Sequence, residues 1–206
     1  MTILVAAAVG YLLGSIPFGL MAGRFFKGVD VREYGSGKIG FTNTLRVLGL
    51  QRSLVVFIAD FAKGSSSALL PLIYSDDPWA RTAGGVAAVV GHIWPLFAGF
   101  HGGRGVLTGA GGLFALNPLA SLALVPVGLL IMYLTRYMSV TSLAVSSLAG
   151  LVFVVLAALG QHPWAYAAYA VAASALIILL HRENIARLRS GREPKIGRGG
   201  QRRLPA

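Results

Sequence analysis

Cysteine is absent from this 206-residue sequence, and acidic residues are few. Without cysteine the chain can form no disulfide framework, no Cys-ligated zinc site and no thioester on its own side chains. Seven residues are Asp or Glu, against 18 Lys and Arg. Because the acidic residues do not gather near histidine, the sequence offers no spacing suited to a metal site, and we expect no metal or other cofactor.

Several catalytic signatures are absent as well. None of the four histidines has an aspartate five positions later, which excludes the His-x4-Asp dyad usual in soluble-loop acyltransferases. Neither a G-x-S-x-G nucleophile elbow nor a G-x-x-x-x-G-K-[ST] phosphate loop occurs. Any chemistry must therefore be built from other arrangements of residues.

Charge is scarce, whereas apolar residues are abundant. Charged residues make up 12% and hydrophobic residues 55% of the chain, while a soluble domain carries about 25% charged residues. Most of the long apolar stretches reach the ~20 residues that a helix needs to cross a bilayer core. They cover residues 3–23, 53–74, 80–100, 105–135, 138–159 and 162–181. We expect one polytopic membrane domain over 1–197 and a basic, disordered tail over 198–206.

The orientation of the chain is predicted from its basic residues. The first apolar stretch has no basic segment before it and exceeds the ~7–15 residues of a signal-peptide core, so we expect it to be retained as a span. Asn117-Pro118 is a turn signal inside the 105–135 stretch, which is either one kinked helix or two. Two helices place the basic 24–52 segment and the basic tail on one face, as the positive-inside rule favours. The prediction is an all-α bundle of about seven transmembrane helices with the N-terminus outside, the C-terminus cytoplasmic and Arg81 on the outer side.

The net charge of +11 raises the question of an acidic partner. The basic residues are spread over loops anchored to a bilayer, with no soluble fold to present them to nucleic acid. We therefore expect no nucleic acid and favour membrane phospholipid, whose anionic headgroups contribute ~1 kcal/mol for each nearby Lys or Arg. The sequence carries no signal for an oligomeric state.

The loop between residues 30 and 46 is rich in glycine and in hydrogen-bond donors. Its candidate site residues are Gly35, Ser36, Gly37, Thr42, Asn43 and Arg46. Closely spaced glycines allow successive N–H groups to turn toward one point and form an anion nest. A guanidinium provides a fork that suits phosphate. The alternative is an ordinary flexible loop in which Thr42 or Asn43 caps a short helix.

Asp60 and Lys63 lie inside an apolar stretch, three residues apart. This spacing puts them on one face of a helix, where they can pair. Charges within a membrane cost ~2.5–3.5 kcal/mol each on insertion scales, so a structural or functional reason is expected. Both a structural ion pair and a contact to substrate remain open.

A second glycine-rich turn, Gly102-Gly103-Arg104-Gly105, precedes an apolar stretch. The free N–H groups and the positive dipole end of the helix that begins here predict an anion site, with Arg104 beside it. The alternative is a tight turn with an arginine that extends to the membrane surface. For His92, upstream of the turn, a hydrogen-bonded core histidine is the default interpretation.

Where the last apolar stretch ends, His181 and Asn184 lie three residues apart on one helix face, with Arg187 three further on. The alternative here is an amphipathic helix whose arginines reach lipid headgroups. Ser142, with Ser139, is a minor element that could equally cap or pack a helix. By the predicted topology all these patches share the cytoplasmic ends of the spans, which indicates a membrane-embedded pocket for phosphate groups.

In these motifs the chain resembles the bacterial acyl-phosphate:glycerol-3-phosphate acyltransferases, the PlsY family, from Met1 to about Gly197. The resemblance lies in blocks that occur in the same order. They are Gly14-Ser15-Ile16-Pro17-Phe18-Gly19, Gly35-Ser36-Gly37 with Gly40, Thr42-Asn43 and Arg46, Asp60 with Lys63-Gly64, Gly91-His92 with Pro95 and Gly102 to Val106, and His181-Arg182 with Asn184-Ile185, Gly191 and Glu193. The family usually has Asn where this chain has Lys38, Lys where it has Arg104, and a small residue at Phe41.

The resemblance implies an enzyme that transfers a fatty acyl group from acyl phosphate to the 1-hydroxyl of glycerol 3-phosphate, giving lysophosphatidic acid and phosphate. It also implies a multi-pass protein of the bacterial cytoplasmic (inner) membrane, active in phospholipid synthesis. Carried onto this chain, Ser36, Thr42, Asn43 and Gly102-Gly103 would cradle acyl phosphate. Glycerol 3-phosphate would be held and oriented by Arg46, Arg104, Ser142, His181 and Asn184.

Two other functions are open at this point. Charged residues within spans also mark transport paths, so a permease for a phosphorylated solute is one alternative, although no inverted repeat is visible. The other is an inactive, divergent member of the family.

Overall fold

The computed structural model describes residues 1–203, and within that range regular structure is entirely helical. The ten α-helices are α1 (Thr2–Gly14), α2 (Phe18–Lys27), α3 (Phe41–Leu48), α4 (Leu50–Leu69), α5 (Pro78–Ile93), α6 (Val106–Leu116), α7 (Pro118–Thr135), α8 (Met138–Ala158), α9 (Trp164–Leu180) and α10 (Arg182–Arg189). Short 3-10 turns lie at η1 (Val31–Glu33), η2 (Leu70–Ile73) and η3 (Leu96–Ala98). The predicted all-α class is confirmed for the described part of the chain.

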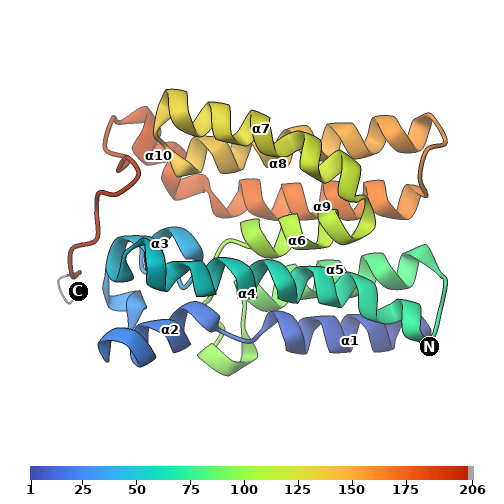
Figure 1. The fold of residues 1–206 in the computed structure, drawn as a ribbon, viewed down its shortest axis with the longest axis horizontal. Helices are drawn as coiled ribbons and strands as arrows, with labels where there is room; N and C mark the ends of the chain where they lie inside the picture. Colours follow the sequence, from blue (N-terminus) through green and yellow to red (C-terminus); the bar gives the residue numbers. More distant parts are fainter. Residues whose placement is uncertain (204–206) are drawn as a thin grey trace.

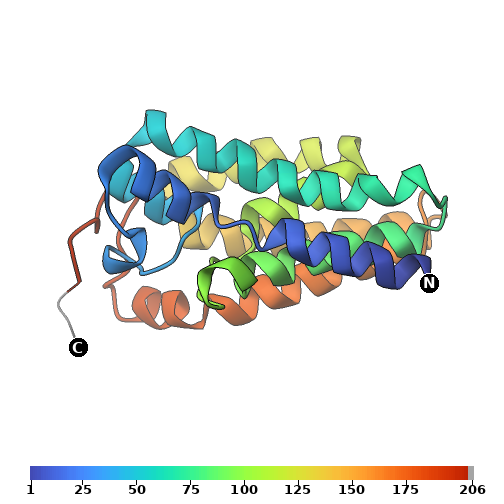
Figure 2. The same cartoon turned by 90° about the horizontal axis from the view of Figure 1, so that it is seen from below.

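The long helices lie along one axis of the molecule (Figure 1). α1, α5, α7 and α9 run from the end that holds the N-terminus toward the end that holds α3 and α10, and α4, α6 and α8 run in the opposite direction. Seen from below, α2 and the C-terminal tail again lie at the end opposite the N-terminus (Figure 2). The loop between α2 and α3 and the C-terminal tail are thereby collected at one end of the bundle.

Proline and asparagine set two of the helix boundaries. α1 ends at Gly14, and Pro17, which has no N–H to donate, precedes α2. Asn117 separates α6 from α7: its side-chain oxygen accepts a hydrogen bond from Ala120 N–H at 3.1 Å, and Pro118 occupies the first position of α7. The 105–135 stretch therefore forms two helices, which is the alternative that the positive-inside rule favoured.

The number of membrane spans is lower than expected. By length and composition, four segments are able to cross a membrane: Thr2–Lys27, Leu50–Ile73, Pro118–Thr135 and Met138–Ala158. α9 and α10 add a fifth if the pair, bent by 52°, counts as one span. The prediction of seven is thus not met within residues 1–203. α5 has 16 residues and α6 has 11, because Pro95, the glycine-rich turn and Pro118 shorten both helices.

Glycine brings neighbouring helices into close contact. A Cβ atom on Gly14 of α1 would lie 2.2 Å from the carbonyl oxygen of Ala88 on α5. A Cβ on Gly111 of α6 would lie 2.0 Å from the carbonyl oxygen of Phe61 on α4. In lipid, where burial of apolar surface between helices gains little, such backbone approach is a main source of helix association. The high glycine content therefore serves packing as well as the loops.

Arg81 joins three helices at the end of the bundle that holds the N-terminus. From α5 its Nε donates to the carbonyl of Ala68 at 3.2 Å and its Nη2 to the carbonyl of Ala115 at 2.7 Å. Its Nη1 donates to the Tyr166 hydroxyl, and the guanidinium carbon lies 5.2 Å from the centre of the Tyr166 ring. The guanidinium thus satisfies carbonyls near the C-terminal ends of α4 and α6 and ties both to α9.

Arg81→Met is expected to lower the free energy of unfolding by about 2–4 kcal/mol, because three hydrogen bonds and a cation–π contact are lost. Thermal unfolding of purified protein in detergent measures the change. Arg81→Lys should recover only part of it, since an ammonium cannot replace a planar fork. Arg52→Met, which removes an exposed cation in the first turn of α4, is the control. Equal losses for Arg81→Met and Arg52→Met would contradict this role.

Candidate active site

A cavity of about 520 Å³ lies among α3, α4, α6, α7, α8 and α9. Toward α3 and α10 polar side chains line it, and along α6 and α7 its walls are mainly apolar. The cavity is therefore divided by chemistry into a polar end and an apolar channel.

The polar end unites the segments that the sequence singled out. Of the predicted site residues, the cavity is lined by Ser36, Thr42, Asn43, Arg46, Asp60, Arg104, Ser142, His181 and Asn184. They come from stretches of chain that are far apart in the sequence. The topology predicted that these side chains lie at the same end of the spans. The fold brings them together in one cavity.

The four predicted glycines do not line the cavity. Gly35 N–H donates to the carbonyl of Gln201 at 3.0 Å, Ser36 N–H to the Oδ1 of Asn43 at 2.9 Å, and Gly37 N–H to the carbonyl of Tyr34 at 2.9 Å. These three N–H groups are engaged within the chain, so they do not form the anion nest that we expected of this loop. Positive φ angles at Gly35 (54°) and Gly37 (69°) explain why glycine is required there.

Gly102 and Gly103 also serve packing. Gly103 N–H donates to the carbonyl of His92 at 3.0 Å, and a Cβ on Gly103 would lie 2.0 Å from the Nε2 of His92. A Cβ on Gly102 would lie 2.1 Å from the carbonyl oxygen of His92. This turn is therefore folded closely onto His92, which itself lines the cavity.

Asn43 organises the first loop. Its amide nitrogen lies 2.8 Å from the carbonyl of Val31, 3.1 Å from that of Tyr34 and 2.9 Å from that of Lys38, and its Oδ1 accepts from Ser36 N–H. The side chain is buried and its hydrogen-bonding capacity is used within the protein. Asn43 is thus placed to shape the loop that carries Ser36, rather than to offer free donors to a ligand.

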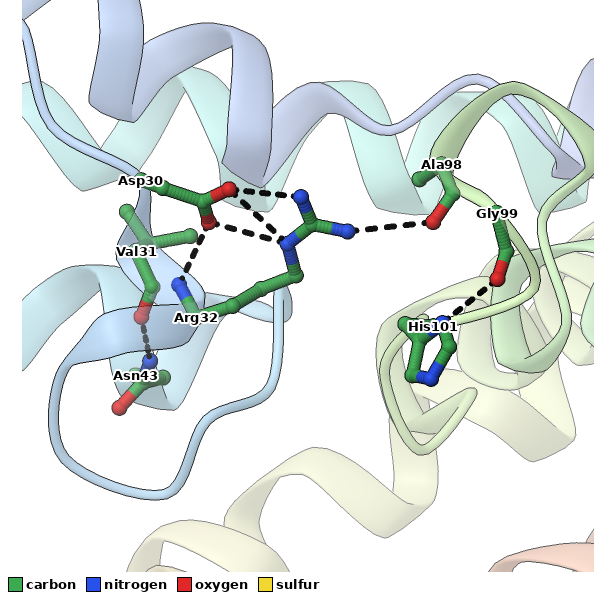
Figure 3. A network of polar contacts seen from close by, with 7 residues as sticks. All are labelled: Asp30, Val31, Arg32, Asn43, Ala98, Gly99 and His101. Carbon is green, nitrogen blue, oxygen red and sulfur yellow. Dashed lines mark hydrogen bonds and ion pairs between the residues drawn. The ribbon is translucent and has the colours of Figure 1, made fainter. Parts of the chain in front are cut away.

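Asp30 and Arg32 connect the two glycine-rich loops, and sequence analysis did not single them out (Figure 3). The Arg32 guanidinium forms two-pronged contacts with Asp30, with Nη2 2.6 Å from Oδ2, and its Nη1 donates to the carbonyl of Ala98 at 3.1 Å. Beyond Ala98, His101 Nδ1 contacts the carbonyl of Gly99, within the loop that leads to Arg104. The hydrogen bond from Arg32 holds the pKa of Asp30 below its usual range, which keeps this connection ionised.

Several buried polar atoms at the polar end have no partner within residues 1–203. They are the Nε of Arg46, the Nε of Arg104, the Oγ of Ser139 and the Oδ1 of Asn184. Burial lowers the pKa of Arg46, and burial together with the positive charge of Arg187 lowers the pKa of Arg104 to about 10. With a pKa of about 10, the Arg104 guanidinium remains charged at neutral pH. Buried polar atoms without partners are costly. An anion would accept hydrogen bonds from the two guanidiniums and from Ser139, whereas the Oδ1 of Asn184 is an acceptor and would be satisfied by a ligand hydroxyl.

His181 is held in a defined orientation. It is buried between α9 and α10, and its Nδ1 lies 2.7 Å from the carbonyl oxygen of Ile177. Because a carbonyl can only accept, Nδ1 carries the proton in this contact. In the neutral ring Nε2 is then left as an acceptor. His181 can therefore accept a hydrogen bond, and a proton, from a ligand hydroxyl.

Glu193 fixes Asn184 and Arg187, and sequence analysis did not place it in the site. Its Oε1 accepts from Asn184 Nδ2 at 2.6 Å and its Oε2 from Arg187 Nε at 2.7 Å. Burial alone would raise the pKa of Glu193, but the hydrogen bonds from Asn184 and Arg187 outweigh it and hold the pKa below its ordinary value. The one sequence feature that could have indicated a role for Glu193 is that it is a single carboxylate in a strongly basic tail.

Glu193→Gln is expected to lower the free energy of unfolding at pH 7 by about 1.5–3 kcal/mol, the value of hydrogen bonds to a charged group. Because its folded pKa is lowered, ionised Glu193 stabilises the fold above the ordinary glutamate pKa, and this contribution is lost as the pH falls through the folded pKa. The difference in melting temperature between wild type and variant should therefore shrink on acidification. A difference that stays constant between about pH 7 and about pH 3.5 would contradict the assignment, and Glu183→Gln, at an exposed position, is the control.

Asp60 and Lys63 form the buried ion pair that their spacing predicts. Lys63 Nζ lies 2.9 Å from Asp60 Oδ1, and both side chains are at most 3% exposed. The same Nζ donates to the carbonyl of Ile16 at 3.0 Å, in the break between α1 and α2. On the other side, His92 Nδ1 lies 3.4 Å from Asp60 Oδ1. The pair therefore ties α4 to the α1–α2 break, while Asp60 and His92 face the cavity.

The apolar channel extends from the polar end along the interior of the bundle. On α7 its lining runs from Leu122 to Met132, which corresponds to about 15 Å of helix. Leu113 and Phe114 of α6 line it as well. Its length and its apolar lining suit an extended hydrocarbon chain. A ligand with a phosphate at one end and an acyl chain at the other would fill both parts of the cavity.

The fold and the site together define an integral membrane protein, all-helical over residues 1–203, whose cavity joins buried basic side chains to an apolar channel. The family model described as "Glycerol-3-phosphate acyltransferase" matches residues 4–191. A relative of that name from Synechococcus sp. (strain CC9902) is 40% identical over 198 residues, covering 96% of this chain and 97% of that protein. Another, from Geobacillus kaustophilus (strain HTA426), is 40% identical over 194 residues, covering 94% and 96%. The chain belongs to the glycerol-3-phosphate acyltransferase family.

Solved structures agree with this assignment. The crystal structure of PlsY (YgiH), an integral membrane glycerol 3-phosphate acyltransferase, in its glycerol 3-phosphate form is 40% identical, covers 96% of both chains and has a TM-score of 0.87. Its lysophosphatidic acid form is 39% identical, covers 95% of both chains and has a TM-score of 0.85. The resemblance to the PlsY family that the motifs predicted is confirmed.

Proposed function

We propose that the protein is a membrane acyltransferase that moves a fatty acyl group from acyl phosphate to the 1-hydroxyl of glycerol 3-phosphate, releasing lysophosphatidic acid and phosphate. The observation that carries the proposal is the joining, in one cavity, of guanidinium donors that lack partners within residues 1–203 with an apolar channel. The similar protein PlsY has crystal structures in a glycerol 3-phosphate form and a lysophosphatidic acid form. Substrate and product of the proposed reaction share the phosphate and differ by the acyl chain, which matches the two parts of the cavity.

The reaction can proceed without a covalent enzyme intermediate. The 1-hydroxyl oxygen of glycerol 3-phosphate attacks the acyl carbonyl carbon, a new C–O ester bond forms, and the bond from that carbon to the phosphate oxygen breaks. The hydroxyl proton passes to an oxygen of the departing phosphate. Acyl phosphate is already activated, so positioning and charge stabilisation supply the rate. We favour the phosphate of the donor as base, with the Nε2 of His181 as the alternative on the protein.

The roles of the site residues follow from their places in the cavity. Ser36 and Thr42 would hold the acyl phosphate, while Asn43 and the Gly102-Gly103 turn would act indirectly, through the shape of the loops. Glycerol 3-phosphate would be held by Arg46 and Arg104 and oriented by a second group of residues. That group consists of Ser142, His181 and Asn184.

The same proposal places the protein in the bacterial cytoplasmic membrane with the N-terminus outside and the C-terminus in the cytoplasm. The N-terminus lies at the end of the bundle opposite α3 and α10 (Figure 1), the helices that carry Arg46 and Asn184 of the cavity lining. The basic first loop and the basic tail share the end with the site, as the positive-inside rule requires of a cytoplasmic end. Glycerol 3-phosphate would then enter from the cytoplasm, and acyl phosphate and surrounding phospholipid from the bilayer.

Proteoliposomes that contain the purified protein test the proposal against the permease alternative, which the family relatives do not favour. Given labelled glycerol 3-phosphate and acyl phosphate, they should accumulate label in lysophosphatidic acid within the membrane. Unmodified label in the vesicle lumen, with none in lipid, would support a permease instead. Label in neither place would indicate an inactive member of the family.

A further inference from the structure

The chain after α10 runs back across the polar end of the molecule toward α3 (Figure 1). It first contacts the α7–α8 connection, where Ile196 N–H donates to the carbonyl of Arg136 at 2.9 Å. The ammonium of Lys195 lies 5.8 Å from the centre of the Tyr137 ring. Residues 195–203 are called the strap below. One end of the strap is thus fastened beside the start of α8, the helix that carries Ser139 and Ser142.

The other end of the strap is bonded to the loop that carries Ser36. Gln201 accepts a hydrogen bond from Gly35 N–H at 3.0 Å, and Arg203 N–H donates to the carbonyl of Glu33 at 2.7 Å. Between them, Tyr34 and Arg202 form an antiparallel bridge. The Arg202 side chain also lies 2.9 Å from the Glu33 carboxylate, although both are well exposed, so this ion pair contributes little. The strap is therefore joined to this loop mainly by backbone hydrogen bonds at Glu33 and Gly35, the residues on either side of Tyr34. Gly35 directly precedes Ser36.

The strap also fits closely against α3 at Gly200. A Cβ atom on Gly200 would lie 2.6 Å from the carbonyl oxygen of Arg46 and 3.3 Å from the Cβ of Arg46. No side chain fits there unless the strap or α3 moves. These contacts involve residues beyond position 191, where the match to the family model ends.

We propose that the strap is a positioning segment for the acyl transfer, which holds Ser36 and Arg46 in register with the part of the site on α8, α9 and α10. This inference rests on the proposed function. Ser36 follows the bonded segment Glu33–Gly35, and α3 meets the strap at Arg46 itself. With the strap in place, the loop and α3 lose fewer degrees of freedom when phosphate binds, which lowers the cost of forming the complex. We expected residues 198–206 to be a basic, disordered tail, and the proposal gives residues 198–203 of it a positioning role. Residues 204–206 lie outside the described range.

A cross-link tests where the strap lies, independently of activity. The chain has no cysteine, so Tyr34→Cys/Arg202→Cys supplies the sole thiol pair. Antiparallel bridge partners have Cα atoms about 4.5–5.5 Å apart, within disulfide range. We expect oxidation in membranes to form the disulfide, whereas Tyr34→Cys/Ser190→Cys should form none. The cross-linked enzyme should keep its activity, because a positioning segment has no need to leave. No disulfide, or a disulfide that abolishes activity until it is reduced, would overturn the proposal.

A matched pair of substitutions tests what the strap does. Gly200→Val should displace the strap from α3, whereas Gln201→Val introduces the same side chain at the next, exposed position. For Gly200→Val we expect a rise of about tenfold in the KM for glycerol 3-phosphate, the worth of two backbone hydrogen bonds. The kcat and the melting temperature should stay near wild type, as should all values for Gln201→Val.

The disulfide yield shows whether Gly200→Val displaces the strap, independently of its effect on the KM. Added to the Tyr34→Cys/Arg202→Cys double variant, Gly200→Val should also reduce the disulfide yield. An unchanged KM, whether the yield falls or is retained, would overturn the positioning role. A wild-type enzyme that makes no lysophosphatidic acid would instead overturn the proposed function, and the disulfide yield would still report where the strap lies.

Discussion

Arg104→Ala is expected to lower the kcat/KM for glycerol 3-phosphate by about 10²–10³-fold, the cost of removing one preorganised donor from a developing charge. The Arg104 guanidinium lines the polar end, and its Nε has no partner within residues 1–203. Burial and the charge of Arg187 lower its pKa to about 10, which leaves it protonated at neutral pH. Product formation from acyl phosphate, measured across a range of glycerol 3-phosphate concentrations, gives the value.

The stability of Arg104→Ala separates function from folding. A buried cation without a partner is a cost to the folded state, so the variant should melt at the wild-type temperature or above. Arg104→Lys is the matched control, because it keeps the positive charge and removes only the planar guanidinium. It should retain activity within about tenfold, the change reflecting loss of the planar fork. Undiminished turnover in Arg104→Ala, or a loss of activity that follows a loss of folded protein, would contradict the assignment.

Lys63→Met is expected to lower the free energy of unfolding by about 3–5 kcal/mol, the cost of leaving one member of a buried ion pair without the other. Asp60 would then have no lysine or arginine partner among residues 1–203, and the neutral ring of His92, whose Nδ1 lies 3.4 Å from Asp60 Oδ1, supplies no balancing charge. The carbonyl of Ile16 would lose a donor as well, which loosens the α1–α2 break. Thermal unfolding in detergent and the yield of folded protein from membranes measure the effect.

Restoring neutrality should rescue much of this loss. In Asp60→Asn/Lys63→Met both charges are gone, and we expect the double variant to be more stable than Lys63→Met alone, because no unpaired charge stays buried. If the double variant loses as much as the sum of the two single substitutions, the ion pair is not the source of the effect.

Much of the fold could be predicted because it depends on local signals. Asn117-Pro118 marks the α6–α7 boundary through a cap and a missing N–H, and both are properties of the residues themselves. The span count was less predictable. Counting apolar residues overlooked how far proline and glycine shorten α5 and α6, and short helices need protein neighbours that a sequence does not display.

The site, like the fold, was predictable where it depends on local residue types and unpredictable where it depends on distant contacts. The residue types at Ser36, Arg46, Arg104 and His181 indicate phosphate chemistry, and topology puts them at one end. The role of each glycine depends on neighbours that are distant in sequence. A side chain at position 103 would collide with His92, and one at position 35 would collide with Asn43 and with the strap. For the same reason the carboxylate of Glu193 could not be assigned to Asn184 and Arg187 before the chain was seen to turn back.

The choice of acyl donor tests the central claim most directly. Purified wild-type protein and Arg104→Ala are each given glycerol 3-phosphate, once with acyl phosphate and once with acyl-CoA, and lysophosphatidic acid is measured. The account predicts product from wild type with acyl phosphate alone and roughly a hundredfold less, or lower still, from Arg104→Ala, in line with the cost of losing one preorganised donor. Product from acyl-CoA alone, product from neither donor, or equal product from the two proteins would contradict it.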